Sequence, residues 1–174
     1  LVARTVDELG GIDCVVNNAA SALRTDLASL DERLWHKSLD VNLLGPLLLV
    51  KAARPHLAAS PAASVINVLS VGGLRGSLSL LGYGSAKAAL RHATEVLAAE
   101  LAPEGIRVNA IAPAATDGAM MPDDKAYLAT LTAKQPIDRL VPPSEMAANI
   151  VYLCSDEAQF ITGQTVSVSG GMVM

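Results

Sequence analysis

Short runs of β-branched and aliphatic residues alternate with longer segments of helical pattern along this chain. The runs cover Ile12 to Val16, Ser64 to Leu69, Ile106 to Ile111 and Thr165 to Val168. Apolar runs of this length are typical of strands that are buried on both faces, as in a parallel sheet. Because helical segments separate the runs, the pattern predicts an α/β fold with a doubly wound, Rossmann-like parallel sheet.

The segments between the runs predict three helices, over Asp31 to Ala59, about Tyr83 to Ala102 and about Pro143 to Cys154. Pro103 and Gly105 end the second helix, since proline removes a helical donor and glycine favours a helix end. The first helix is too apolar to be covered on one side only. We therefore expect it to be buried on two faces.

The length of 174 residues is that of one domain, without repeats or linkers. Residues 1–174 are therefore expected to form a single Rossmann-like domain. The stretch from Ala114 to Val141 has weak periodicity and holds Met120 and Met121. This stretch is long for a connection between elements, which indicates a lid that covers a ligand site. The alternative is a surface excursion that binds no ligand.

Composition excludes several classes of partner and compartment. With 13 basic and 17 acidic residues and no basic run, a nucleic-acid partner is not expected. The most apolar stretch, Leu43 to Ala53, is far shorter than the roughly 20 residues that span a bilayer, and the N-terminus lacks a secretory pattern. We expect a cytoplasmic protein without membrane contact, in which Cys14 and Cys154 are two reduced core thiols.

Tyr83 and Lys87 lie four residues apart near the start of the second predicted helix. This spacing places both side chains on one face, with about 5–6 Å between their Cβ atoms. An ammonium at about 4 Å supplies about 4 kcal/mol at an effective dielectric of about 20, enough to lower a tyrosine pKa from about 10 to near 7. The pair is therefore a candidate general acid/base, although two unrelated surface residues would give the same spacing.

Polar residues follow three of the predicted strands. Ser70 closes the second run, thirteen residues before Tyr83, while Asn17 to Ala20 follow the first run and Asn109 to Ala114 end the third. The carboxyl ends of parallel strands meet at one edge of the sheet, where open α/β sheets bind ligands. We expect these residues to converge on one cleft.

These residues resemble the classical short-chain dehydrogenase/reductase family over essentially the whole chain. The matching positions are Asn17 to Ala20, Asn42, Ser70, Tyr83 with Lys87, Asn109 with Pro113 and Ala114, Phe160 to Thr165, and Gly170 to Met172. The resemblance implies an NAD(P)-dependent oxidoreductase that interconverts a secondary alcohol and a ketone, with a small or medium-sized, partly apolar substrate. It also implies a homodimer or homotetramer, paired through the two long helices.

The resemblance assigns catalytic roles to four residues. Tyr83 would exchange a proton with the substrate oxygen, and Ser70 would hold that oxygen. Lys87 would lower the pKa of Tyr83 and bind the nicotinamide ribose, and Asn42 would join a proton relay through a bound water. Contacts with NAD or NADP are implied for Asn17, Ala19, Ala20, Tyr83, Lys87, Pro113, Ala114 and Thr116.

The chain departs from the family pattern at several points. Ala20 and Ala114 replace glycines, and Gly118 stands where threonine is usual near the nicotinamide amide. The glycine-rich turn that cradles the pyrophosphate belongs about 70 to 80 residues before Asn17, but only sixteen residues precede it. We expect a longer parent polypeptide, with a truncated, catalytically silent oligomerisation or binding module as the alternative.

Pro46 lies four residues after Asn42 inside the first predicted helix. Since proline has no N–H and its ring clashes one turn back, the Asn42 carbonyl loses its helical partner. The freed carbonyl could hold the relay water that the resemblance implies, or Pro46 could simply bend the helix around the sheet.

Overall fold

The computed structural model describes residues 1–118 and 124–173. Its centre is a four-stranded parallel sheet in the order β1-β2-β3-β4. The strands are β1 (Cys14–Asn17), β2 (Ser64–Val68), β3 (Arg107–Pro113) and β4 (Thr165–Val168). The predicted Rossmann-like parallel sheet is confirmed, and the strands differ from the predicted runs only at their ends.

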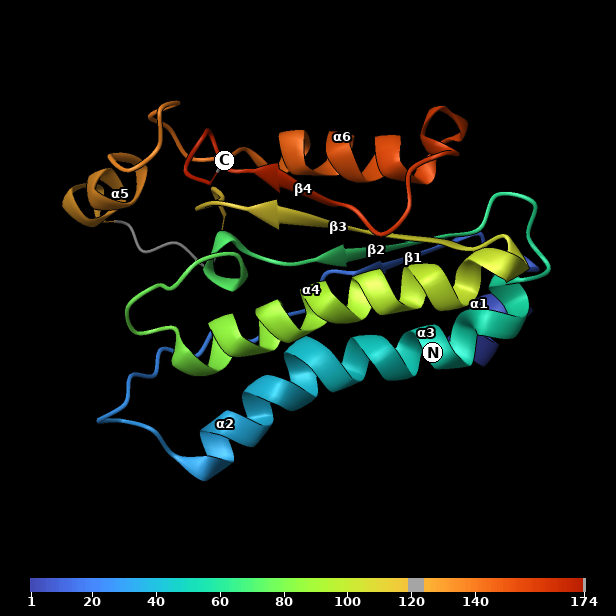
Figure 1. The fold of residues 1–174 in the computed structure, drawn as a ribbon, viewed down its shortest axis with the longest axis horizontal. Helices are drawn as coiled ribbons and strands as arrows, with labels where there is room; N and C mark the ends of the chain where they lie inside the picture. Colours follow the sequence, from blue (N-terminus) through green and yellow to red (C-terminus); the bar gives the residue numbers. More distant parts are fainter. Residues whose placement is uncertain (119–123, 174) are drawn as a thin grey trace.

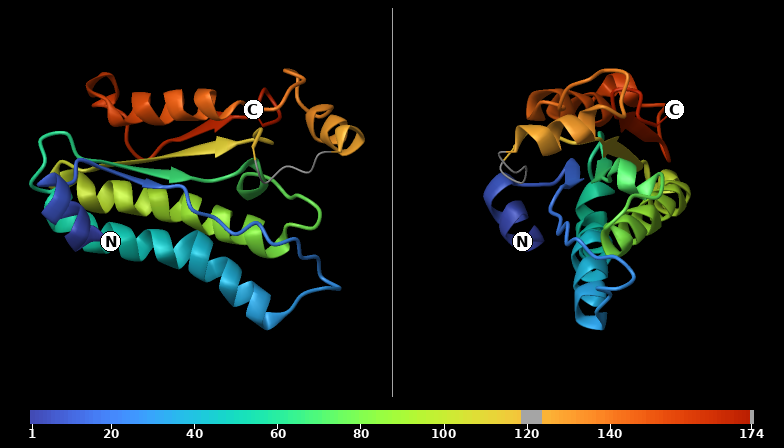
Figure 2. Two further views of the ribbon diagram at one scale, coloured as in Figure 1. Left: turned by 180° about the vertical axis from the view of Figure 1, so that it is seen from behind. Right: turned by 90° about the vertical axis from the view of Figure 1, so that its left-hand side faces the viewer.

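Helices cover both faces of this sheet (Figure 1, Figure 2). The α-helices are α1 (Val2–Leu9), α2 (Glu32–Leu39), α3 (Gly45–Leu57), α4 (Leu81–Leu101), α5 (Lys125–Thr132) and α6 (Pro143–Cys154). Short 3-10 turns are η2 (Val71–Gly73), η3 (Ala102–Glu104) and η4 (Asp156–Ala158), and a π-helical turn, η1, spans Asp40–Leu44. In Figure 1, α3 and α4 lie on one face of the sheet and α6 lies on the other, while α5 and η2 lie near the carboxyl ends of the strands.

The core consists of two apolar layers that share the strands. Val65 faces the layer formed with Val50 and Leu57 of α3, whereas Ile66 faces the layer formed with Leu153 of α6. Val65 and Ile66 are both 0% exposed. Burial on both faces explains why the strands appear in the sequence as continuous apolar runs rather than alternating ones.

The first predicted helix is observed as α2, η1 and α3 in direct succession. Asp31 caps its start, with the carboxylate accepting a hydrogen bond from the Leu34 N–H at 3.0 Å. In η1 the Gly45 N–H bonds the Asp40 carbonyl, five residues back, just before Pro46. The missing proline donor therefore produces a π-helical turn at this place.

The predicted burial of this long helix on two faces is not met within the chain. Pro46, Val50 and Ala53 face inward, but Leu44 and Leu48 are 46% and 54% exposed. The same side of the molecule carries α4, which packs beside α2 and η1.

The stretch expected to form a lid contains one short helix, α5. Asp124 caps it by accepting a hydrogen bond from the Tyr127 N–H. Arg24, from the loop after β1, donates a hydrogen bond to the Tyr127 hydroxyl, and its guanidinium lies 5.3 Å from the centre of that ring. Met120 and Met121 lie outside the described residues.

Candidate active site

Tyr83 and Lys87 lie in the first turns of α4, on the face that packs toward η2. Thr25, in the loop after β1, fixes the start of this helix. Its carbonyl accepts from the Leu81 N–H at 3.0 Å, and its hydroxyl accepts from the Gly82 N–H at 3.2 Å. The β1 loop thus satisfies helix donors that have no partner within the helix.

Two glycines let η2 pack directly on α4. A Cβ atom on Gly84 would lie 2.7 Å from the Gly72 carbonyl oxygen, and one on Gly73 would lie 2.8 Å from the Lys87 Cβ. Ser70 precedes this turn and accepts a hydrogen bond from the Gly72 N–H at 3.1 Å. The close approach carries the Ser70 hydroxyl to the Tyr83 phenol, where it forms a hydrogen bond that lowers the pKa of the phenol.

Lys87 is almost completely buried, with 1% of its surface exposed. Its Nζ donates to the Val68 carbonyl, at the end of β2, over 2.6 Å, and lies 5.8 Å from the centre of the Tyr83 ring. Burial disfavours the charged ammonium and lowers the pKa of Lys87 to about 8. The ammonium therefore sits beneath the tyrosine with a single hydrogen bond among the described residues.

The expected lowering of the Tyr83 pKa by Lys87 is not found in this geometry. Burial raises the pKa of Tyr83, and the hydrogen bond with Ser70 opposes that rise only in part. The reason is that burial of the phenol is the largest effect on its pKa, and Lys87 directs its hydrogen bond at Val68 rather than at the phenol. Tyr83 is therefore protonated at neutral pH.

Asn42 is fully buried in η1 and uses its side chain to hold the loop after β1. Its amide oxygen accepts from the Ser21 N–H at 3.0 Å, while its amide nitrogen donates to the carbonyls of Ser21 and Ser38 at 3.0 and 2.9 Å. These bonds occupy the side-chain donors. Any relay through Asn42 would therefore use its main-chain carbonyl.

Asn17 is also buried, and its side chain connects two strands. Its amide nitrogen donates to Asn67 across β1 and β2 at 2.8 Å, and Asn67 in turn donates to Thr94 of α4 at 2.9 Å. This polar chain fixes α4 to the sheet near the predicted cleft.

The other residues for which cofactor contacts were expected lie at the carboxyl ends of β1 and β3. Ala19 and Ala20 are exposed, Pro113 and Thr116 are half-buried, and Ala114 is 8% exposed. The Thr116 hydroxyl donates to the Ala114 carbonyl at 3.2 Å. Among the described residues, no group of histidine, cysteine and acidic side chains has the arrangement of a metal site.

The sequence interpretation missed the residues that assemble this site. Gly72, Gly73, Gly84 and Thr25 contribute no chemistry, yet they set the distance between Ser70 and α4. The available signal was Gly72 and Gly73, two and three residues after Ser70, together with Gly84 directly after Tyr83.

Comparison with known proteins identifies the family. A family model described as Enoyl-(Acyl carrier protein) reductase matches residues 1–173. Cis-4-hydroxycyclohexanecarboxylate dehydrogenase of Sinomonas cyclohexanicum is 36% identical over 173 residues, which cover 98% of this chain and 70% of that protein. The human dehydrogenase/reductase SDR family member 4 is 37% identical over 175 residues, covering 98% of this chain and 63% of that protein. The chain belongs to the classical short-chain dehydrogenase/reductase family.

A solved structure of a dehydrogenase has the same fold. The structure of 4-hydroxyisoleucine dehydrogenase complexed with NADH superposes with a TM-score of 0.91 at 28% sequence identity, covering 98% of this chain and 72% of the other. The chain thus spans 63% to 70% of the length of the two curated relatives named above. No helix among the described residues has both the length and the apolar character to cross a membrane.

Proposed function

We propose that this chain is part of an NAD(P)-dependent oxidoreductase that interconverts a secondary alcohol and a ketone, with Tyr83 as general acid/base. The observation that carries the proposal is the meeting of the Ser70 and Tyr83 hydroxyls above the buried Lys87 ammonium at the carboxyl edge of the sheet. Family membership supports the same reaction class.

Tyr83 donates its proton to the ketone oxygen in reduction and accepts a proton from the alcohol in oxidation. Because burial raises the pKa of Tyr83, the phenol is in its acidic form at neutral pH. Ketone reduction is therefore favoured at neutral pH, and alcohol oxidation rises as the pH becomes alkaline. Ser70 holds the same oxygen by a second hydrogen bond, so that charge developing on it is stabilised.

Lys87 fits the proposed cofactor. Its ammonium has three donors, of which one is used by Val68 among the described residues, so two remain for the hydroxyls of a nicotinamide ribose. When bound, the nicotinamide supplies or accepts the hydride. The buried lysine holds the ribose and, through it, the geometry around the reacting oxygen.

The remaining cofactor contacts are proposed at the strand ends. The exposed backbone at Ala19 and Ala20, and the side chains and backbone of Pro113, Ala114 and Thr116, would border the nicotinamide half. Asn17 would act there mainly by fixing the end of β1.

Proton exchange with solvent is proposed to pass through η1. The Asn42 carbonyl has no helical donor from Pro46, which makes it available to a water between Lys87 and solvent.

The remaining parts of the proposal rest on the family resemblance. They are a small or medium-sized, partly apolar substrate, a homodimer or homotetramer, and a cytoplasmic location.

The test is a direct assay of the protein expressed from its complete gene. NADH and NADPH are each supplied with ketones, and NAD and NADP with secondary alcohols, including hydroxy acids and 3-oxoacyl thioesters. The proposal expects a substrate-dependent change in the absorbance of the reduced nicotinamide with one of these pairs. Binding of neither cofactor to the folded protein would overturn it.

A further inference from the structure

The two cysteines, 140 positions apart in sequence, meet at the opposite end of the sheet from the candidate active site. The sulfur atoms of Cys14 and Cys154 lie 2.8 Å apart and share a hydrogen bond. Cys14 opens β1 and Cys154 is the last residue of α6, and both are half-buried. Both cysteines are free thiols, as expected, but the sequence analysis did not predict that they meet.

Ser64 and Arg107 lie in register with Cys14 on the next two strands of the sheet. Cys14 pairs with Ser64 between β1 and β2, and Ser64 pairs with Arg107 between β2 and β3. The Ser64 hydroxyl is buried without a regular hydrogen-bond partner among the described residues, and it lies beside both sulfur atoms. The thiol pair thus has a spare polar hydroxyl next to it.

Arg107 fixes a positive charge beside Cys154. Its guanidinium donates to the carbonyls of Leu153 at 2.7 Å and of Ser155 at 3.4 Å, the residues on either side of Cys154. A helix C-terminus disfavours an anion, and the guanidinium there counteracts this effect. Arg107 therefore favours a thiolate at Cys154.

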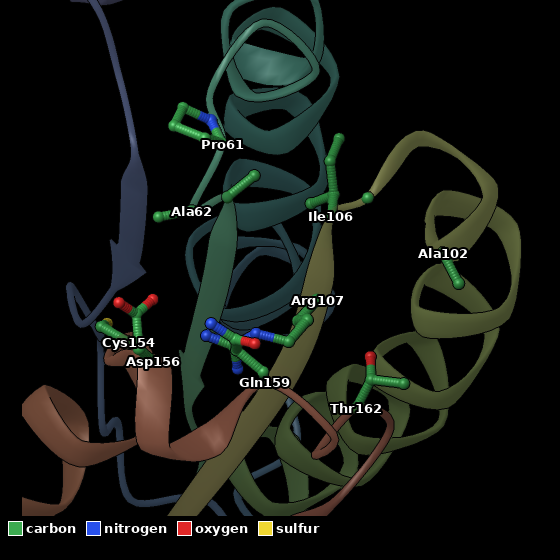
Figure 3. A pocket seen from close by; sticks show the side chains of 11 residues that line it. Pro61, Ala62, Ala102, Ile106, Arg107, Cys154, Asp156, Gln159 and Thr162 are labelled. Carbon is green, nitrogen blue, oxygen red and sulfur yellow. The ribbon is translucent and has the colours of Figure 1, made fainter.

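Cys154 is also accessible from outside. It lines a pocket of about 390 Å³ together with Arg107, Asp156 and Gln159. Figure 3 shows Cys154 beside Asp156, with the side chains of Arg107 and Gln159 close to each other nearby. A small polar molecule can reach this sulfur without passing the active site.

We propose that Cys14 and Cys154 form a peroxide-responsive thiol pair, in which Cys154 reacts first and Cys14 closes a reversible intramolecular disulfide between β1 and α6. The assignment of order follows from position: Cys154 borders the pocket and the guanidinium, while Cys14 lies in the strand behind it.

The reaction balances with a hydroperoxide as oxidant. The Cys154 thiolate attacks one peroxide oxygen, the O–O bond breaks, and the products are a sulfenic acid and an alkoxide or hydroxide that takes up a proton. The Cys14 sulfur then attacks the Cys154 sulfur, forming the S–S bond and releasing water. Two thiols lose two electrons in total, and the peroxide gains them.

The protonation states support this order. The hydrogen bond from Cys14 lowers the pKa of Cys154 to about 6, while the same contact and burial raise the pKa of Cys14. The other groups facing Cys154 are the Ser64 hydroxyl from β2, Arg107 from β3 and Asp156 from η4. A change of reactivity near pH 6 is therefore expected from the thiol pair itself.

The experiment treats the folded full-length protein with a small excess of hydrogen peroxide and maps its peptides without reduction. We expect a Cys14–Cys154 linked peptide pair, a mass loss of about 2 Da, and full reversal by dithiothreitol. The initial reaction rate should reach half its maximum near pH 6. Failure to link these two cysteines, or a rate that follows an ordinary thiol with a pKa of about 8.5, overturns the proposal.

Two variants test the order of reaction. Cys14→Ala should stop at a sulfenic acid on Cys154 that dimedone traps, and its half-maximal rate should move to higher pH because the thiol donor is lost. Cys154→Ala should leave the Cys14 thiol unreacted under the same exposure. Oxidation of Cys14 in the Cys154→Ala variant at the wild-type rate would contradict the assigned order.

Discussion

Replacing Lys87 by methionine separates the cost of burying this side chain from its role in catalysis. Methionine is close to lysine in length but carries no charge. Burial lowers the pKa of Lys87 from its ordinary value of 10.5 to about 8. At about 1.4 kcal/mol per pKa unit, the charged lysine costs the folded state about 3 kcal/mol at neutral pH. Removing the charge therefore stabilises the folded state by the same amount, but losing the hydrogen bond to Val68 offsets about 1–2 kcal/mol of this stabilisation.

The Lys87→Met variant is therefore expected to be more stable than the wild type by about 1–2 kcal/mol at pH 7, while turnover falls by about a hundredfold or more and cofactor affinity weakens. The assay is urea unfolding of the cofactor-free protein, followed by kinetics and cofactor titration. Lys37→Met, at an exposed position on α2, is the matched control and should leave stability and activity nearly unchanged.

The pH dependence gives this prediction a definite sign. Between the folded pKa of about 8 and the unfolded value of 10.5, the unfolded state binds more protons at this site, so wild-type stability rises with pH. The stability advantage of Lys87→Met should therefore shrink by about 2 kcal/mol between about pH 7 and about pH 9.5. A variant less stable than the wild type by more than about 2 kcal/mol at pH 7, or an advantage that does not change with pH, would refute the reasoning.

Three further predictions concern other parts of the site and surface. Ser70→Ala should lower kcat by about 10²–10³, measured with saturating cofactor, because one donor to the substrate oxygen is lost; a loss under about threefold would exclude that role. Gly84→Ala should lower both kcat and the melting temperature, because its Cβ would lie 2.7 Å from a backbone oxygen, whereas Gly76→Ala, with nothing within 4 Å, should change neither. Leu48→Arg should shift the full-length protein from a dimer or tetramer toward monomer in sedimentation, while Leu78→Arg, at a loop position that is 97% exposed, should not; a wild-type monomer at micromolar concentration would contradict the oligomer.

The sheet could be predicted from the sequence because strands that are buried on both faces have apolar residues at consecutive positions. Val65 and Ile66 face opposite apolar layers, so the strand appears as an uninterrupted apolar run. The four-residue spacing of Tyr83 and Lys87 likewise fixed their common helix face. Pro46 marked the place where the helix departs from regular geometry, although the π-helical form of that turn was not predicted.

Contacts between distant segments were beyond the sequence interpretation. The meeting of Cys14 with Cys154 depends on which helix covers the start of β1, and no local pattern records this. The prediction that the pKa of Tyr83 is lowered was wrong for a related reason. Helix spacing gives the distance between two side chains, but the hydrogen bond of Lys87 to Val68 and the burial of both groups are set by the packed structure.

The central claim is that Tyr83 transfers the proton in a nicotinamide-dependent reaction. The most direct measurement compares wild type and Tyr83→Phe in the full-length protein, with cofactor affinity from nicotinamide fluorescence and hydride transfer from single-turnover kinetics. Loss of the phenol proton with retention of the ring predicts cofactor affinity within about threefold of wild type and a fall in the transfer rate of about 10²–10⁴. A variant that keeps more than about a tenth of the wild-type transfer rate would contradict the account.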